Sequence, residues 1–105
     1  MKKKIIYIDI DETICTHNRK NPSVSCDYSE AQPIIENIAK ANKLFDEGHT
    51  IVYWTARGTV TGIDWTDITK KQLIDWGAKH HDLKLGKPQY DLFIDDKNLN
   101  TRDWE

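Results

Sequence analysis

Six polar residues stand at or near the ends of apolar segments, and their side chains are of the types that perform phosphoryl transfer. In chain order they are Asp9, Asp11, Thr55, Lys87, Asp95 and Asp96. A carboxylate can act as a nucleophile or as a general acid and base. A lysine and a hydroxyl can hold a phosphate group. Singly, each residue also suits an ordinary turn, strand end or solvated surface, so the prediction rests on their combination.

The segments that carry these residues have the composition of buried strands. Residues 5–8, 50–55 and 90–95 are rich in β-branched and aromatic side chains. In the first two segments the apolar residues follow one another without alternation, which is typical of strands buried on both faces of a parallel sheet. We expect a further short strand around Leu83 and Leu85.

Two segments between these strands have helical periodicity. The stripe of the first consists of Ile34, Ile35, Ile38, Ala41, Leu44 and Phe45. Pro33 suits its first turn and Gly48 its end. We expect a second helix over about Trp65–Trp76, stopped by Gly77. One face of this second helix is expected to hold Trp65, Ile68, Gln72 and Trp76.

The order of these elements predicts an α/β fold with a parallel sheet and right-handed crossovers. A chain of 105 residues has room for one domain, spanning residues 1–105. Because ligands of such sheets bind beyond the carboxyl ends of the strands, the six polar residues should meet there. Carboxylates that converge repel one another, and Mg²⁺ relieves that repulsion. The pattern therefore predicts phosphoryl chemistry with Mg²⁺.

Composition excludes several other classes of protein. Fifteen Lys and Arg against seventeen Asp and Glu leave a net charge of −2, which argues against a nucleic-acid-coating protein. No apolar run exceeds four residues, so no membrane-spanning helix is expected. Acidic residues interrupt the first apolar run too early for an export signal, and we expect a cytoplasmic protein with Cys15 and Cys26 as free thiols.

Together and in this order, the polar groups resemble the four motifs of the haloacid dehalogenase superfamily of phosphohydrolases. The matching segments are Asp9-Ile10-Asp11-Glu12-Thr13, then Thr55, then Lys87, and finally Ile94-Asp95-Asp96. The resemblance spans about residues 5–96. One departure is Glu12, where family members commonly carry glycine. The resemblance implies a three-layer sandwich around a central parallel sheet, without a cap domain.

The resemblance also implies a role for each residue. Asp9 is expected to attack phosphorus and form an aspartyl-phosphate, and Asp11 to act as general acid and then as base. Thr55 is expected to hydrogen-bond a phosphoryl oxygen, and Lys87 to hold Asp9 and offset charge. The expected ligands of Mg²⁺ are the Asp9 side chain, the Asp11 backbone carbonyl, Asp96 directly and Asp95 in support.

The chain has a looser similarity to a small branch of this superfamily that lacks the cap domain. Members of that branch are often associated with capsule or surface-polysaccharide synthesis. The similarity implies a sugar phosphate or a related small phosphorylated metabolite as substrate. Arg57 is a candidate to bind a second group of the substrate, or else forms a surface salt bridge, and His17 is a weaker candidate. Without a cap, only residues 12–29 and 56–64 are left to shape the pocket, so the site is open or is covered by a neighbouring subunit of a homo-oligomer.

Several alternatives stay open at this point. A receiver-like phosphoacceptor module also uses an acidic pair, a threonine and a lysine, although in a different order. A nucleic-acid 3′-phosphatase or a catalytically silent structural partner is also conceivable, but the charge balance disfavours the former. Cys15, His17 and Cys26 could form a weak metal corner, whereas the tandem His80-His81 is expected to be a solvated pair.

Overall fold

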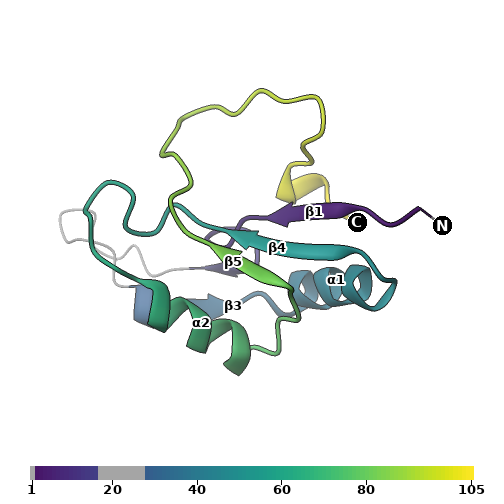
Figure 1. Ribbon diagram of the computed structural model, residues 1–105, viewed down its shortest axis with the longest axis horizontal. Helices are drawn as coiled ribbons and strands as arrows, with labels where there is room; N and C mark the ends of the chain where they lie inside the picture. The colour runs from purple at the N-terminus through teal and green to yellow at the C-terminus, as the bar shows by residue number, and fades with distance from the viewer. Residues whose placement is uncertain (1, 17–27) are drawn as a thin grey trace.

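The computed structural model describes residues 2–16 and 28–105 and contains a parallel three-stranded sheet. Its strands are β1 (Ile5–Ile8), β4 (Thr50–Trp54) and β5 (Asp82–Lys84), in the order β1-β4-β5 (Figure 1). Ile5 is paired with Thr50, and Val52 with Asp82. The α/β class, the parallel pairing and these three strands were all predicted from the sequence. The expectation that β1 is buried on both faces was wrong, because Ile5 and Tyr7 are exposed.

Both helices lie on one face of this sheet (Figure 1). They are α1 (Ile35–Asp46) and α2 (Thr66–Asp75). The core joins this face to the helices and includes Ile8, Ile51 and Tyr53 of the strands with Ile38 and Leu73 of the helices. The described residues thus form two layers, and the three-layer sandwich is not confirmed.

The residues that the two helices bury differ in part from those expected from the sequence. In α1, Ile38 and Ala41 are buried as expected, but Ile35 is exposed. In α2 the buried residues are Thr69, Gln72 and Leu73, whereas Ile68 lies at the surface. Gln72 is buried and Trp65 and Trp76 are half-buried, as predicted, so Ile68 alone was placed wrongly. The inner face also carries Thr69 and Leu73, because this helix turns polar groups inward to bind a buried arginine.

A short antiparallel ribbon follows the first strand. It pairs β2 (Cys15–Thr16) with β3 (Gln32–Pro33), and the 3-10 turn η1 (Tyr28–Glu30) precedes β3. Pro33 is thus in this ribbon and not in the first turn of α1. The ribbon agrees with the expected loop or small hairpin. His17 and Cys26 lie outside the described residues, so their predicted roles stay predictions.

The strand expected over residues 90–95 is absent from the part of the chain that the structure describes. Residues 85–100 instead leave β5 in a wide arc, and the chain returns beside β1 at η2 (Thr101–Asp103; Figure 1). The side chains of Leu92 and Ile94 are 75% and 87% exposed. A strand needs a neighbour for its N–H and C=O groups, and this segment has no such neighbour within its own sheet.

No helix among the described residues is long and apolar enough to span a membrane.

Candidate active site

Three of the predicted residues meet at the carboxyl edge of the sheet. Asp9 follows β1, and its Oδ1 lies 3.5 Å from Nζ of Lys87. The backbone N–H of Lys87 donates to the carbonyl of Thr55, which directly follows β4, at 3.1 Å. Lys87 is held further by Thr59, whose hydroxyl donates to its carbonyl at 2.8 Å. These hydrogen bonds place the ammonium group beside the Asp9 carboxylate.

The Lys87 ammonium also lies near two aromatic rings. It is 5.7 Å from the ring centre of Trp54 and 5.4 Å from that of Tyr90. A cation near the face of an aromatic ring is stabilised by the negative potential of that face. These rings help to hold the cation at the site, next to the 37% exposed side chain of Asp9.

The electrostatic surroundings of Asp9 favour its protonated form. Burial is the main cause that raises the pKa of Asp9 above 3.8, and the nearby Asp11 raises it further. Lys87 and a hydrogen bond from the Ile10 backbone act in the opposite direction but do not cancel the effect of burial. A carboxylate with a raised pKa is more basic, and therefore a better nucleophile, than one in water.

Thr55 is placed at the site but is completely buried. Its hydroxyl oxygen accepts a hydrogen bond from the backbone N–H of Arg57 at 3.1 Å, which closes the turn after β4. Its backbone N–H donates to the carbonyl of Lys84 at 3.0 Å. Thr55 therefore shapes the loop that carries Arg57, and its predicted hydrogen bond to a phosphoryl oxygen stays a prediction.

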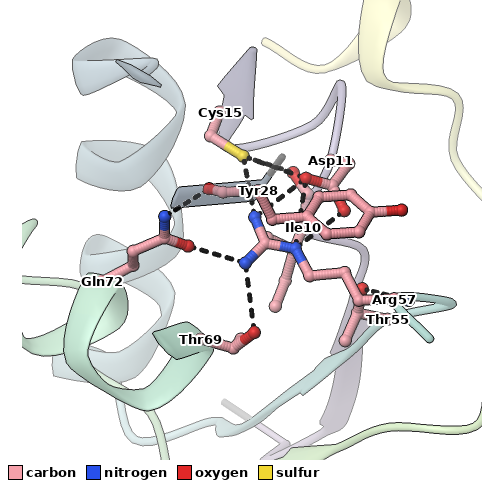
Figure 2. A network of polar contacts seen from close by, with 8 residues as sticks. All are labelled: Ile10, Asp11, Cys15, Tyr28, Thr55, Arg57, Thr69 and Gln72. Atoms are coloured by element: carbon pink, nitrogen blue, oxygen red, sulfur yellow. Dashed lines mark hydrogen bonds and ion pairs between the residues drawn. The ribbon is translucent and has the colours of Figure 1, made fainter. Parts of the chain in front are cut away.

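The carboxylate of Asp11 pairs with a buried arginine, Arg57. Nε of Arg57 donates to Asp11 Oδ2 at 3.0 Å, and Nη2 donates to Asp11 Oδ1 at 2.9 Å (Figure 2). The arginine side chain is fully buried, whereas 18% of the Asp11 side chain is exposed. Such a two-pronged ion pair is short, directional and strong when little water reaches it.

The remaining N–H groups of Arg57 bind the inner face of α2 and the ribbon. Nη1 donates to Thr69 Oγ1 at 3.1 Å and to Gln72 Oε1 at 2.6 Å. Nη2 also donates to the Cys15 sulfur at 3.7 Å, and the guanidinium carbon lies 4.7 Å from the ring centre of Tyr28 (Figure 2). All the guanidinium N–H groups are thereby used.

Arg57 is consequently neither a substrate ligand nor a surface salt bridge in this structure, and both earlier interpretations are corrected. Its donors are taken up by protein groups, and its side chain is 0% exposed. The sequence contained a usable signal, because Thr69 and Gln72 stand three residues apart on one helix face that would otherwise be apolar. Polar residues on an inner helix face indicate a buried partner.

Cys15 is a structural thiol in this arrangement. Its sulfur donates to Asp11 Oδ1 at 3.5 Å and lies in the core. Burial, together with the nearby Asp11, raises the pKa of Cys15 to about 12. The thiol therefore keeps its proton at neutral pH, which disfavours the metal corner, since metals bind the thiolate.

The tandem histidines also have structural partners. Nδ1 of His81 accepts a hydrogen bond from the Ile51 backbone at 3.0 Å, and its ring stacks on Phe45 with 4.7 Å between the ring centres. The His80 ring contacts Tyr53 edge to face at 5.6 Å. His81 is exposed and His80 is half-buried, so the predicted solvated pair is confirmed in part, while both rings also pack against the sheet or α1.

The acidic pair Asp95-Asp96 is not brought to the other carboxylates. Both residues are exposed, and Asp95 Oδ1 accepts a hydrogen bond from the backbone of Lys97 at 3.4 Å. Among residues 2–16 and 28–105, no three His, Cys, Asp or Glu side chains lie close enough to hold a metal ion together. Within one chain, the described residues therefore do not fit the predicted Mg²⁺ site.

Comparison with known proteins supports the fold and nothing finer. The chain matches no protein-family model and no curated protein. It is similar to the crystal structure of a target protein from Vibrio cholerae, with a TM-score of 0.80 and 23% sequence identity, over 98% of this chain and 87% of the other. At this identity the likeness shows a shared fold alone.

Replacing Arg57 by Met should lower the free energy of unfolding by about 3–5 kcal/mol, because the Asp11 carboxylate then loses a buried partner. Lys79→Met is the matched control, since the Lys79–Asp46 pair has the same 2.9 Å separation but both side chains are more than half exposed. Its cost should be about 0–1 kcal/mol. Chemical denaturation measures both, and equal losses would contradict the role given to Arg57.

Asp9→Asn should make the protein more stable at neutral pH. The raised pKa of Asp9 means that the folded protein binds this proton more tightly than the unfolded chain does. Stability therefore falls as the pH rises through the interval between 3.8 and the raised folded pKa, and the neutral amide avoids this loss. The melting temperature should exceed that of wild type at pH 7 and converge with it in acid. Asp46→Asn, at an exposed ion pair, should show no such gain.

Proposed function

We propose that the chain is a phosphomonoester hydrolase that uses the Asp9 carboxylate as a covalent nucleophile. The observation that carries this proposal is the pairing of a partly exposed carboxylate of raised pKa with a fixed lysine at the carboxyl end of a parallel strand. The carboxylate supplies the attacking oxygen, and the ammonium supplies positive charge where a phosphoryl group would approach. The similarity of the motifs to those of the haloacid dehalogenase superfamily supports the same conclusion.

In the first step, an oxygen of Asp9 would form a bond to phosphorus while the bond from phosphorus to the leaving oxygen breaks. The leaving oxygen takes a proton and departs as an alcohol. In the second step, water attacks the aspartyl-phosphate, the phosphorus–Asp9 bond breaks, and inorganic phosphate leaves with the carboxylate restored. Lys87, beside Asp9, would offset the negative charge of the phosphoryl group in both steps.

Asp11 is our candidate for the proton transfers, and its pairing with Arg57 sets a condition on that role. Both of its oxygens accept hydrogen bonds from Arg57, so the carboxylate is held as an acceptor. To donate a proton to the leaving oxygen, the side chain has to turn partly out of this pair. As base in the second step, it would accept the proton of water without leaving Arg57.

The proposed substrate is a sugar phosphate or a related small phosphorylated metabolite. This choice rests on the looser resemblance to small capless members of the superfamily and on the lack of an excess of Lys and Arg over Asp and Glu. For the fold type, we propose the Rossmann-like sandwich of that superfamily. A nucleic-acid 3′-phosphatase is the second candidate. Release of phosphate from a panel of sugar phosphates, nucleotides and 3′-phosphorylated oligonucleotides distinguishes the two, whereas a receiver-like module would show no turnover.

Asp9→Asn should abolish turnover of any phosphomonoester that the wild type hydrolyses, because an amide cannot form the acyl phosphate. A loss of at least about a thousandfold in kcat is expected for a nucleophile that no other group replaces. Asp46→Asn is the control and should keep wild-type rates, since Asp46 pairs with Lys79 at the surface. Wild-type-like rates in Asp9→Asn would refute the nucleophile.

Lys87→Met should move the acidic limb of the kcat/KM profile to higher pH. Lys87 is the strongest of the groups that lower the pKa of Asp9, so its loss leaves burial opposed by less charge. The nucleophile is then protonated at a higher pH, and kcat/KM falls earlier on acidification. Steady-state rates across the acidic range test this. Lys84→Met is a nearby control whose cation lies beside Tyr7.

A further inference from the structure

Two aromatic residues, Tyr28 and Trp65, lie beside the Asp11–Arg57 ion pair. The guanidinium carbon of Arg57 is 4.7 Å from the ring centre of Tyr28 (Figure 2). The rings of Tyr28 and Trp65 meet edge to face, with 5.0 Å between their centres and an angle of 85° between their planes. Both residues are half-buried, so part of each is open to solvent. We call these two residues the aromatic wall.

Helix α2 holds both residues of the aromatic wall in place. Gln72 Nε2 donates to the Tyr28 carbonyl at 2.6 Å, and the Thr69 N–H donates to the Trp65 carbonyl at 3.0 Å. The indole of Trp65 also packs close to the backbone of Gly58, where an added Cβ would lie 3.4 Å from Trp65 Cδ1. Because these contacts come from the folded chain itself, the wall is formed before a ligand arrives, which lowers the entropic cost of binding.

The position of the aromatic wall decides which part of a substrate would meet it. In the proposed reaction, the phosphoryl group is bound beside Asp9 and Lys87, and its leaving oxygen faces Asp11. Arg57 donates to Asp11 at 2.9 Å and carries the Tyr28 ring over its guanidinium group. The carbon skeleton behind the leaving oxygen would therefore lie against the wall.

We propose that the aromatic wall binds the ring of a sugar phosphate while the leaving oxygen of the sugar is turned toward Asp11. This subsite rests on the proposed function and adds to it the residues that recognise the alcohol. The C–H groups of a saturated sugar ring carry a slight positive charge, and the face of an aromatic ring is negative, so the two attract each other. Such a contact favours a ring over an open chain of similar polarity.

The residues next to the aromatic wall favour a sugar over a nucleotide chain. Glu30 stands two residues after Tyr28, Asp64 directly precedes Trp65, and both acidic residues are exposed. Asp64 already accepts one hydrogen bond, from the Thr66 backbone at 2.9 Å, and a carboxylate can accept several. These carboxylates can bind sugar hydroxyl groups, whereas they would repel the further phosphates of an oligonucleotide.

Trp65→Leu tests the aromatic wall, and Trp76→Leu is its matched control. The two tryptophans flank α2, Trp65 before it and Trp76 after it, and both are half-buried. Trp65 is chosen over Tyr28 because loss of the Tyr28 ring would also disturb Arg57. Thermal melting first shows that each variant is folded, and Trp65→Met takes the place of a leucine variant that does not fold.

The two substrates compared are the sugar phosphate that the wild type hydrolyses fastest and glycerol 3-phosphate, which has hydroxyl groups but no ring. Trp65→Leu should lower kcat/KM for the sugar phosphate about three- to tenfold more than for glycerol 3-phosphate, chiefly by raising KM. Trp65→Phe keeps an aromatic face and should restore most of this difference. Trp76→Leu should change both substrates alike.

Inhibition by inorganic phosphate separates a lost subsite from a distorted loop. Phosphate alone binds beside Asp9 and Lys87 in the proposed site, so its inhibition constant should change less than about twofold in Trp65→Leu. An equal loss of kcat/KM for both substrates overturns the wall and leaves the hydrolase standing. Weaker inhibition by phosphate together with such an equal loss shows that Trp65 only shapes the loop, which also overturns the wall.

Two further outcomes concern the class of substrate. A wild type that prefers nucleotides, and loses this preference in Trp65→Leu, overturns the sugar, because a base can stack on the same rings. If the wild type hydrolyses no phosphomonoester, the proposed function fails. Calorimetric titration with glucose 6-phosphate then still decides the wall: weaker binding by Trp65→Leu than by Trp76→Leu supports it, and equal binding or none by the wild type overturns it.

Discussion

The buried guanidinium of Arg57 is the interaction on which the rest of the site depends. It joins the loop after β1, the turn after β4, the inner face of α2 and the ring of Tyr28. A buried charge is tolerated only when its hydrogen bonds are satisfied, so each of these segments has to meet it in one arrangement. The ion pair thereby sets where Asp11 points and which face α2 turns inward.

The Asp11–Arg57 ion pair gives different surroundings to two aspartates that are only two residues apart. Asp9 keeps a partly exposed carboxylate beside Lys87, while Asp11 is bound by Arg57 on the other side of the loop. Two carboxylates in such different surroundings are suited to different tasks, as covalent and acid–base catalysis requires. The backbone of Glu12 is left-handed, with φ of 64°, and turns the chain directly after Asp11. Glycine adopts this conformation at lower cost than glutamate does.

The three-stranded sheet and the exposed residues 88–100 show how little of this small chain is covered by its own elements. Among the described residues, both helices lie on one side of the three-stranded sheet, and neither outer edge of the sheet, at β1 or at β5, carries a further strand. Small domains have little core to spare, so association is a common way to cover what one chain cannot.

The sequence by itself determined the elements whose signals are local: strands β1 and β4, the extent of both helices, and the meeting of Asp9, Thr55 and Lys87. Consecutive apolar residues, helical periodicity and the common direction of parallel strands are enough for these. Only the tertiary structure decided that Arg57 is buried against Asp11, because burial depends on Thr69 and Gln72 of a separate helix. It also decided that residues 90–95 are no strand within this chain, since β-pairing requires a neighbour that local composition cannot supply.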